Sequence, residues 1–576
     1  MFHKLINTLK VTAVFTAVTF FSLAQNPLFI PPVLTGTTFN LNVQADSTEF
    51  FSGHKTPTYG VNGNILAPTL ILNNGDNITL NVTNNLTTTT TMHWHGLHVP
   101  AMDDGGPHHV ILPGNTWSPS FTVMNDAATY WYHPHGENKT DIQVTKGLAG
   151  MIIIRDSIES AITLPRTYGI DDFPLIIQTK CFDVLYQTAI ATVFDTVPMI
   201  NATINPFLDA PAQVVRLRLL NGSSDRSYLF GFSNNQNFNL ITTDGGLLEA
   251  PVTLNRLRLS PGERAEVLVD FTAMTGQTVY FMNYGSQLPN GIIGASTVGN
   301  GMAQIPNYNL NPLNGADYYL LQLNIVNPTS NPVTTIPTTL RSLSPWNTNQ
   351  SNRNRTITLA PLQMSPQTMV EGPFTMNNHQ FSMNTINDTT YLNHIEVWTI
   401  NNQTLVAHPF HIHDIQFFIT DVNGTPAPAY EQGKKDVVLV MPQQTVSFIT
   451  KFEDFSSNDP YMYHCHLLHH EDDGMMASFI VLDSSLVTID EIRGDKSMVV
   501  FPNPIAGNQL NIYFKNNVNN LVNFKITNLL GEIILDNVLN ITNHYATIDI
   551  NTLSAGMYAI QINSENKNST FQFIRK

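Results

Sequence analysis

Residues 461–476, YMYHCHLLHHEDDGMM, place four histidines, a cysteine and methionines in one short run. Imidazole, thiolate and thioether groups are ligands for copper and zinc. If this run is an extended strand, His464 and His466 face one way and Cys465 faces the other. The run therefore predicts ligands for two metal sites on opposite sides of one strand.

Three further His-x-His pairs occur elsewhere in the chain. They are His93 and His95 in MHWHG, His133 and His135 in WYHPHG, and His411 and His413 in HPFHIH. Random placement of 19 histidines in 576 residues gives only about 0.6 such pairs. Because residues two apart on a strand share a face, each pair can offer two imidazoles to one site. Eight imidazoles exceed what one ion binds, so the pattern predicts a multinuclear cluster.

Cys465 needs ligand partners of its own on the other face of the strand. His470 and Met475 follow it at intervals of five, and His408 lies just before the third His-x-His pair. One cysteine, two histidines and a weak methionine form the trigonal set that favours copper for electron transfer. Zinc is the alternative metal, and ordinary core packing is the alternative role for Met475.

The elements that position these residues are predicted to be strands. Short runs rich in Val, Ile, Thr and Phe alternate with Asn-Gly, Asp-Gly and Pro turns, as in PTLILNNGDNITLNVTNNL, residues 68–86. Long helical periodicity is not evident. The chain is therefore predicted to be all-β, built of sandwiches or barrels. A net charge of -16 without a basic stripe argues against nucleic-acid binding.

The length of 576 residues requires several domains. Turn-rich joins and a Pro, Asn, Ser and Thr-rich linker at 327–354 divide the chain. The predicted divisions are a signal peptide at 1–24, sandwich domains at 26–156, 160–327 and 345–485, and a small strand-rich module at 497–576.

The first residues read as an export signal. A basic start, an apolar stretch and small residues ending at Ala24 are typical of a secretory cleavage site. The apolar stretch is shorter than the roughly 20 residues needed to cross a bilayer, so a membrane anchor is the weaker alternative. We expect no transmembrane anchor in the mature chain. A disulfide between Cys181 and Cys465 is not expected, because Cys181 lies in an apolar strand-like run, where a lone buried thiol is expected.

With these motifs in this order, residues 45–485 resemble the three-domain multicopper oxidases, which include laccases, bilirubin oxidases and copper-efflux oxidases. The resemblance implies three cupredoxin-like Greek-key sandwiches and four copper ions: one type 1, one type 2 and two type 3. It implies a type 1 copper held by His408, Cys465 and His470 with Met475 axial, and a type 2 copper held by His93 and His411. The type 3 pair would take the remaining paired histidines, His95, His133, His135, His413, His464 and His466.

Reduction of O₂ to water also consumes protons, which carboxylic acids can supply. Glu471 and Asp104 stand where similar enzymes carry proton-relay acids, although each could be only part of an acidic turn. Four more histidines are expected at the surface or behind the ligands. They are His98, His108, His109 and His469.

The resemblance implies one-electron oxidation of a small reducing substrate coupled to four-electron reduction of O₂. Phenols and aryl amines are the favoured donors, and an axial methionine is typical of a low to moderate type 1 potential. Cuprous ion is the close alternative, although Met364, Met369, Met376 and Met383 are too scattered to form a clear thioether patch. The non-enzyme alternative is a copper-binding or electron-carrier protein, which would not need the eight paired histidines.

The last module, with FPNP, NLLGEII and LSAGMYAIQI, is similar to the C-terminal sorting domains of type IX secretion cargo. The resemblance implies export through the periplasm to the cell surface or the medium, with the secretion machinery as partner. A carbohydrate-binding sandwich is the alternative.

Overall fold

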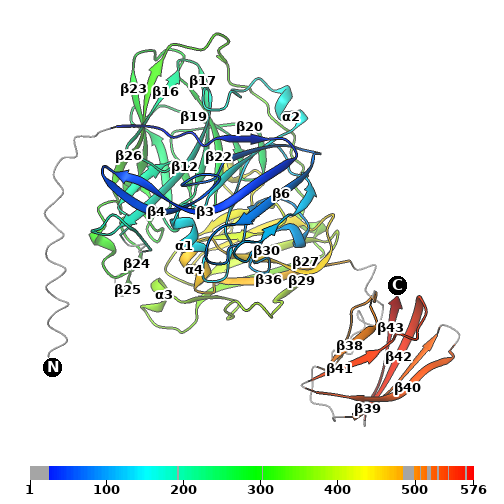
Figure 1. Cartoon of the computed structure of the whole chain (residues 1–576). Helices are drawn as coiled ribbons and strands as arrows, with labels where there is room; N and C mark the ends of the chain where they lie inside the picture. The colour runs from blue at the N-terminus through cyan, green and yellow to red at the C-terminus, as the bar shows by residue number, and fades with distance from the viewer. Residues whose placement is uncertain are drawn as a thin grey trace, which may run out of the picture. The chain divides into compact units, whose positions relative to one another are not determined.

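The structure is a computed structural model that describes residues 25–190, 194–300, 303–483, 498–505, 507–514, 521–528, 531–542, 544–564 and 567–576. The predicted signal peptide, residues 1–24, lies outside the described residues. The chain divides into two compact units, one up to Val481 and one from Leu482 (Figure 1). Within the described residues the longest helix, α1 (Thr140–Thr145), has six residues, so none could span a membrane. The all-β prediction is confirmed.

The first sandwich contains two five-stranded sheets. One sheet has the order β2 (Val33–Thr35), β5 (Thr69–Asn73), β11 (Gly150–Arg155), β10 (Thr129–His133) and β7 (His93–His95). The other has β4 (His54–Val61), β3 (Thr38–Phe51), β6 (Asn77–Asn84) and β8 (Thr116–Trp117), with β9 (Ser120–Thr122) also on β6. In β6 every second residue is buried, including Ile78, Leu80 and Val82, because a half-buried strand alternates its faces. These side chains form the core between the sheets.

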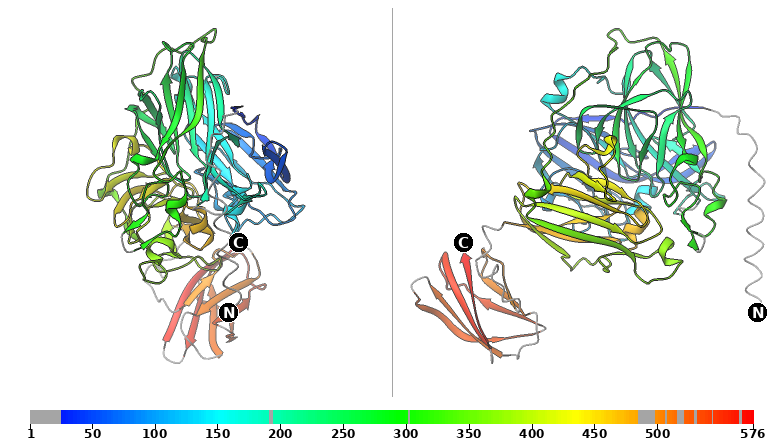
Figure 2. Two further views of the ribbon diagram at one scale, coloured as in Figure 1. Left: turned by 90° about the vertical axis from the view of Figure 1, so that its left-hand side faces the viewer. Right: turned by 180° about the vertical axis from the view of Figure 1, so that it is seen from behind.

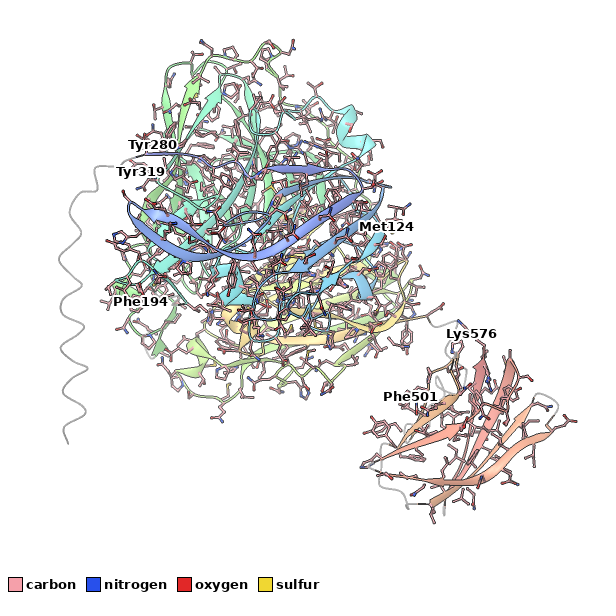
Figure 3. The ribbon with its side chains drawn as sticks, viewed as in Figure 1. Met124, Phe194, Tyr280, Tyr319, Phe501 and Lys576 are labelled. Atoms are coloured by element: carbon pink, nitrogen blue, oxygen red, sulfur yellow. The ribbon has the colours of Figure 1, made fainter. Side chains whose placement is uncertain are left out.

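The second sandwich has a six-stranded and an eight-stranded sheet. The six-stranded sheet contains β1 (Asn26–Pro27), β16 (Pro206–Pro211), β26 (Asp317–Val326), β23 (Thr278–Tyr284), β18 (Tyr228–Phe232) and β21 (Leu257–Leu259). The eight-stranded sheet contains β15 (Thr203–Ile204), β14 (Val197–Ile200), β12 (Asp172–Phe182), β17 (Val214–Asn221), β22 (Arg264–Asp270), β19 (Phe238–Thr243), β20 (Gly246–Leu254) and β13 (Thr188–Ala189). Tyr280 and Tyr319 lie side by side on the six-stranded sheet, with ring centroids 4.5 Å apart (Figure 3).

The third sandwich carries most of the candidate ligands. One sheet contains β28 (Phe374–Met376), β27 (Arg353–Pro361), β30 (Ile395–Asn402), β34 (Thr445–Lys451) and β32 (Phe418–Val422). The other contains β29 (Asp388–Tyr391), β36 (Met476–Leu482), β35 (Ser457–Cys465), β31 (His408–Ile412) and β33 (Val437–Val440). Its core includes Trp398, Phe448 and Tyr463. Figure 2 shows the layered strands of these sandwiches from two more sides.

Short helical segments connect the strands of the first unit. They are η1 (Ala101–Asp103), α2 (Ser157–Ala161), η3 (Gly285–Gln287), η4 (Tyr308–Leu310), η5 (Thr348–Gln350), α3 (Thr368–Glu371), η6 (Ala429–Glu431) and α4 (Leu468–Asp472). A two-stranded ribbon, β24 (Gly299–Asn300) and β25 (Ala303–Gln304), completes the unit. Helix α4 lies against α1 (Figure 1), because the Asp472 carboxylate accepts the backbone N–H groups of Thr140 and Asp141 at 3.0 Å each.

The second unit is a small β-sandwich of two antiparallel sheets. One contains β37 (Met498–Phe501), β38 (Gln509–Phe514) and β41 (Tyr545–Asp549), and the other contains β40 (Ile533–Asn540), β39 (Leu521–Asn528), β42 (Gly556–Ser564) and β43 (Lys567–Arg575). Ile512, Ile526, Ile560 and Phe573 belong to its own apolar core.

Candidate metal centres

The first candidate centre lies at the end of β35, where Cys465 pairs with Phe410 of the neighbouring strand β31. The Cys465 Sγ atom lies 3.4 Å from His408 Nδ1 and 3.6 Å from His470 Nδ1, and all three side chains are buried. A metal ion bound about 2.0–2.3 Å from nitrogen and sulfur ligands in a plane requires about this separation between ligand atoms. The hydroxyl of Thr404, 2.8 Å from His408 Nε2, orients that ring so that Nδ1 faces the thiol.

Met475 is held beside the same three residues. Its carbonyl accepts the backbone N–H of Cys465 at 3.1 Å, and its own N–H donates to the carbonyl of His470 at 2.8 Å. The residue is fully buried in the core that also contains Cys465. The chain therefore brings the backbone of Met475 back beside Cys465 and His470.

The eight paired histidines converge on one region between the first and third sandwiches. They form three buried groups whose nitrogen atoms lie within 4.8 Å of one another. The groups are His93, His411 and His413; His95, His133 and His466; and His135, His413 and His464. Separations between the facing nitrogens include 3.2 Å for His135 to His413 and 3.2 Å for His95 to His466. This arrangement fits three closely spaced metal ions.

The outer nitrogens of these rings are occupied by hydrogen bonds, which turns the inner nitrogens toward one another. The Nδ1–H groups of His93, His133, His411 and His464 donate to the backbone carbonyls of Asp104, Pro134, Asp436 and Cys465. Among the described residues, Nε2 of His93, of His411 and of His464 has no hydrogen-bond partner although it is buried. Buried nitrogen atoms left without partners in this way are suited to a metal.

Burial and repulsion from neighbouring imidazoles favour the neutral form of His411 in the cluster and of His408 in the first centre. Burial lowers the pKa of His411 well below its usual value, and the neighbouring imidazole of His413 lowers it further. The pKa of His408 in the first centre falls to about 3, chiefly because of burial. Metal binding requires the neutral form of histidine, so these two imidazoles are in the form that binds metal.

Asp104 and Glu471, predicted as proton-relay acids, lie directly behind the histidines. Asp104 Oδ2 accepts from His413 Nδ1 at 2.8 Å, and Glu471 contacts Nδ1 of His135 at 3.1 Å and of His464 at 3.2 Å. Burial alone raises the pKa of each acid, but the adjacent imidazoles outweigh it and hold both pKa values well below the usual range. Each carboxylate thus joins histidines of two sandwiches and orients them.

A third acid near the cluster, Asp436, was not indicated by any sequence motif. Asp436 Oδ1 lies 3.2 Å from His95 Nε2, and both of its oxygens accept from Arg264 of the second sandwich at 2.6 Å. Gly96 permits this contact, because a Cβ atom there would lie 2.4 Å from Asp436 Oδ2, and its φ of +83° favours glycine. The only sequence signal is a lone acid directly before the apolar run VVLV.

The four histidines expected at the surface or behind the ligands lie outside the three groups. His98 bonds Asp414 and Asp454, His108 bonds the carbonyl of Met383, His109 stacks on Trp117, and His469 bonds Asp225. Cys181 is a free thiol, which agrees with the prediction, but it is half-buried because β12 ends at the next residue.

Multicopper oxidase family models match residues 42–159, 201–306 and 348–485. The chain is 35% identical to the multicopper oxidase mco of Staphylococcus haemolyticus over 77% of its own length and 88% of that protein. The chain belongs to the multicopper oxidase family. The predicted fold of three cupredoxin-like sandwiches with a C-terminal β-module is confirmed, and copper is the metal that the family implies.

Other proteins to which the chain is similar carry different names. The chain is 31% identical to the cell division protein FtsP of Dickeya dadantii over 80% of its length and 93% of that protein. The structure of a laccase-like multicopper oxidase, CueO, from Ochrobactrum sp. matches with a TM-score of 0.69 and 30% identity, over 79% of this chain and all of that one. A secretion system C-terminal sorting domain model matches residues 499–576, which confirms the predicted nature of that module.

Proposed function

We propose that this multicopper oxidase is a secreted, laccase-like enzyme that oxidises phenols and aryl amines and reduces O₂ to water. The observation that carries the proposal is the convergence of eight buried histidines in three groups beside a separate Cys-His-His set. An electron carrier needs only the second set. The complete cluster also weighs against a purely structural role of the kind that the relationship to a cell division protein raises.

The residues fit four copper ions. His408, Cys465, His470 and Met475 would hold the type 1 ion, and His93 and His411 would hold the type 2 ion. The type 3 ions take His95, His133 and His466 on one side and His135, His413 and His464 on the other, as the nitrogen groups suggest. When bound, these ions supply one-electron oxidation of the donor and four-electron reduction of O₂.

The protein's own residues connect and serve the two centres. Cys465 is bonded through the backbone to His464 and His466, so one peptide stretch joins the donor side to the cluster. A cavity of about 340 Å³ lies against Glu471 and is lined by Glu137, Asp472 and Asp473. This acidic cavity supports delivery of protons from solvent to Glu471, which can pass them on toward the histidine cluster.

The chemical class of electron donor that the enzyme prefers distinguishes a laccase-like oxidase from a cuprous-ion oxidase. The four methionines weighed from the sequence differ in burial: Met364 is exposed, Met376 is buried in the core, and Met369 and Met383 are half-buried. Steady-state O₂ consumption with a phenol, an aryl amine, bilirubin and Cu(I) tests this directly. Preference for Cu(I) over all organic donors would replace the proposal with a copper-detoxifying oxidase.

Metal content separates an oxidase from a carrier. We expect about four coppers per chain. The absorption spectrum should show a blue band from the copper–thiolate bond at about 600 nm and a near-ultraviolet shoulder from the cluster. One copper per chain would favour the carrier.

We further propose that the C-terminal unit directs export from the periplasm to the cell surface or medium. The sorting-domain match and the unit's own core support this, since a separately folded module can be removed without opening the oxidase. Deleting residues 497–576 should leave copper content unchanged and retain the protein in the periplasm. Loss of copper from the truncated protein would contradict this assignment.

A further inference from the structure

The loop between β30 and β31 places a threonine hydroxyl at the far edge of the His408 ring. Thr404 Oγ1 lies 2.8 Å from His408 Nε2, and both side chains are fully buried. Nε2 is on the opposite edge of the ring from Nδ1, which faces Cys465 Sγ at 3.4 Å. The hydroxyl therefore contacts a candidate ligand of the type 1 ion from behind.

Two local turns hold this hydroxyl in place. The backbone N–H of Thr404 donates to Asn402 Oδ1 at 2.9 Å, and the N–H of Val406 donates to Thr404 Oγ1 at 3.2 Å. Asn402 is itself fixed, because its Nδ2 group donates to the carbonyls of Val406 at 2.7 Å and Val440 at 3.0 Å. Turns of this kind bind short polar side chains to the nearby backbone. Thr404 thus has a defined position relative to the ring.

The direction of the hydrogen bond between Thr404 and His408 follows from a count of donors and acceptors. A hydroxyl offers one hydrogen and two lone pairs. Its hydrogen can go to Asn402 Oδ1 at 2.8 Å or to the carbonyl of Val406 at 2.9 Å, and both of these atoms only accept. One lone pair accepts the N–H of Val406. The other is used only when Nε2 of His408 carries the ring proton and donates it, and this tautomer leaves Nδ1 free for a metal.

The far edge of the His408 ring lies in apolar surroundings. The ring of Phe374 contacts it with centroids 4.8 Å apart, and Phe374, Val406 and Val440 are at most 1% exposed. Among the described residues, Thr404 is the one side chain hydrogen-bonded to Nε2. In such surroundings a hydrogen bond is electrostatically stronger than in water, and a hydroxyl that donates onward is a better acceptor.

This contact should act on the electron affinity of the centre. A ligating imidazole that donates its outer N–H becomes a more basic ligand. A more basic ligand stabilises the oxidised ion, which carries the higher charge, over the reduced ion. Four rings of the histidine cluster donate to backbone carbonyls, which no substitution removes, whereas His408 depends on a side chain.

We propose that Thr404 is a positioning residue that lowers the reduction potential of the type 1 centre by accepting the Nε2–H of His408. The inference rests on the proposed function, which takes His408 and Cys465 as ligands of the type 1 ion. Thr404 acts through His408 alone and contacts neither the donor nor the ion.

The first test is a redox titration of the blue band against a mediator in wild type, Thr404→Val and Thr404→Ser. Valine keeps the shape of threonine and removes the acceptor, whereas serine keeps the hydroxyl and removes a methyl group. Thr404→Val should raise the potential, changing the equilibrium constant for one-electron exchange by about three- to tenfold, where tenfold corresponds to about 59 mV. Thr404→Ser should stay within about twofold of wild type, and a purely steric role predicts the reverse order.

Thr450→Val is the matched control for this titration. It removes another fully buried threonine hydroxyl of the third sandwich, which donates to the carbonyl of Gln416. An unchanged potential in Thr404→Val would overturn the proposal, and so would an equal shift in Thr404→Ser or in the control. If Thr404→Val binds no copper, Thr404→Ala replaces it, and a potential no higher than that of Thr404→Ser would overturn the proposal.

The second test measures anaerobic bleaching of the blue band by a weakly reducing chlorinated phenol. A higher potential increases the driving force, so bleaching should be about two- to fivefold faster in Thr404→Val than in wild type. Structural damage would instead slow every donor, and that result would overturn the proposal. Failure of the proposed function is recognised separately, because the wild-type protein would then lack the blue band or O₂ consumption.

Discussion

The two candidate centres are built from very different parts of the chain. The Cys465 thiol meets partners 57 and 5 residues away, all within the third sandwich. In the cluster, His135 meets His413 across 278 residues and His466 meets His95 across 371. The first centre depends on the fold of one domain, whereas the second depends on the docking of two. Perturbing the domain interfaces should therefore affect the cluster and spare the type 1 set.

The largest expected effect comes from removing the thiolate that belongs to one centre only. Cys465→Ser should lose the blue band and lower donor oxidation at least about 10³-fold, while about three coppers per chain remain in the cluster. Copper analysis together with visible and near-ultraviolet spectra checks this. Loss of all copper would show that the two centres do not assemble independently.

The contact between Arg264 of the second sandwich and Asp436 of the third allows the opposite test, in which the cluster is lost and the type 1 set remains. Arg264→Met leaves Asp436 buried without its cation, which should destabilise the junction by about 3–5 kcal/mol. We expect the near-ultraviolet shoulder to disappear and the blue band to persist, with a lower unfolding temperature. As a control, Arg264→Met combined with Asp436→Leu should regain stability but not cluster copper, because His95 has lost its acceptor. A parallel loss of both spectral features in the single variant would contradict independent assembly.

The acids behind the cluster should affect the O₂ side alone. In Glu471→Gln and Asp104→Asn, reoxidation of the reduced enzyme by O₂ should slow about 10- to 100-fold, the usual cost of changing groups that orient metal ligands. Anaerobic reduction by the donor should be unchanged. Stopped-flow measurement of reduction by the donor and of reoxidation by O₂ tests this. Slower reduction by the donor in either variant would contradict the assignment of these acids to the O₂ side alone.

A smaller effect is expected from His98, which joins the first sandwich to Asp414 and Asp454 of the third. Burial lowers its pKa, but the two carboxylates outweigh burial and raise it from 6.5 to about 9. Because the folded pKa is raised, the stabilisation is complete below about pH 6.5 and is lost as pH rises through about 9.

Denaturant unfolding of His98→Ala and wild type at pH 6, 8 and 10 measures this linkage. The variant should be less stable at pH 6 by about 1–3 kcal/mol, and the difference should vanish near pH 10. A difference that stays constant across this range would mean that the contribution of His98 is packing rather than charge.

The ligand residues could be predicted from the sequence because strand geometry is local. A His-x-His pair on a strand must present both rings to one face, and the positions of His464, Cys465 and His466 follow from that rule. Asp436 and Arg264 could not be predicted in this way. Their meeting depends on how the second sandwich docks, and neither the VVLV strand start nor the SPGERAEV turn carries a pattern for it.

The four consecutive residues at the end of α4 have a consequence for protein engineering. His469 faces the second sandwich, His470 the thiol, Glu471 the histidine cluster and Asp472 the backbone of α1 in the first sandwich. A designer who excised the third sandwich as a portable blue electron carrier would leave three polar side chains without their counterparts. Such a minimal module would need new surface residues at these positions before it could be soluble and keep its colour.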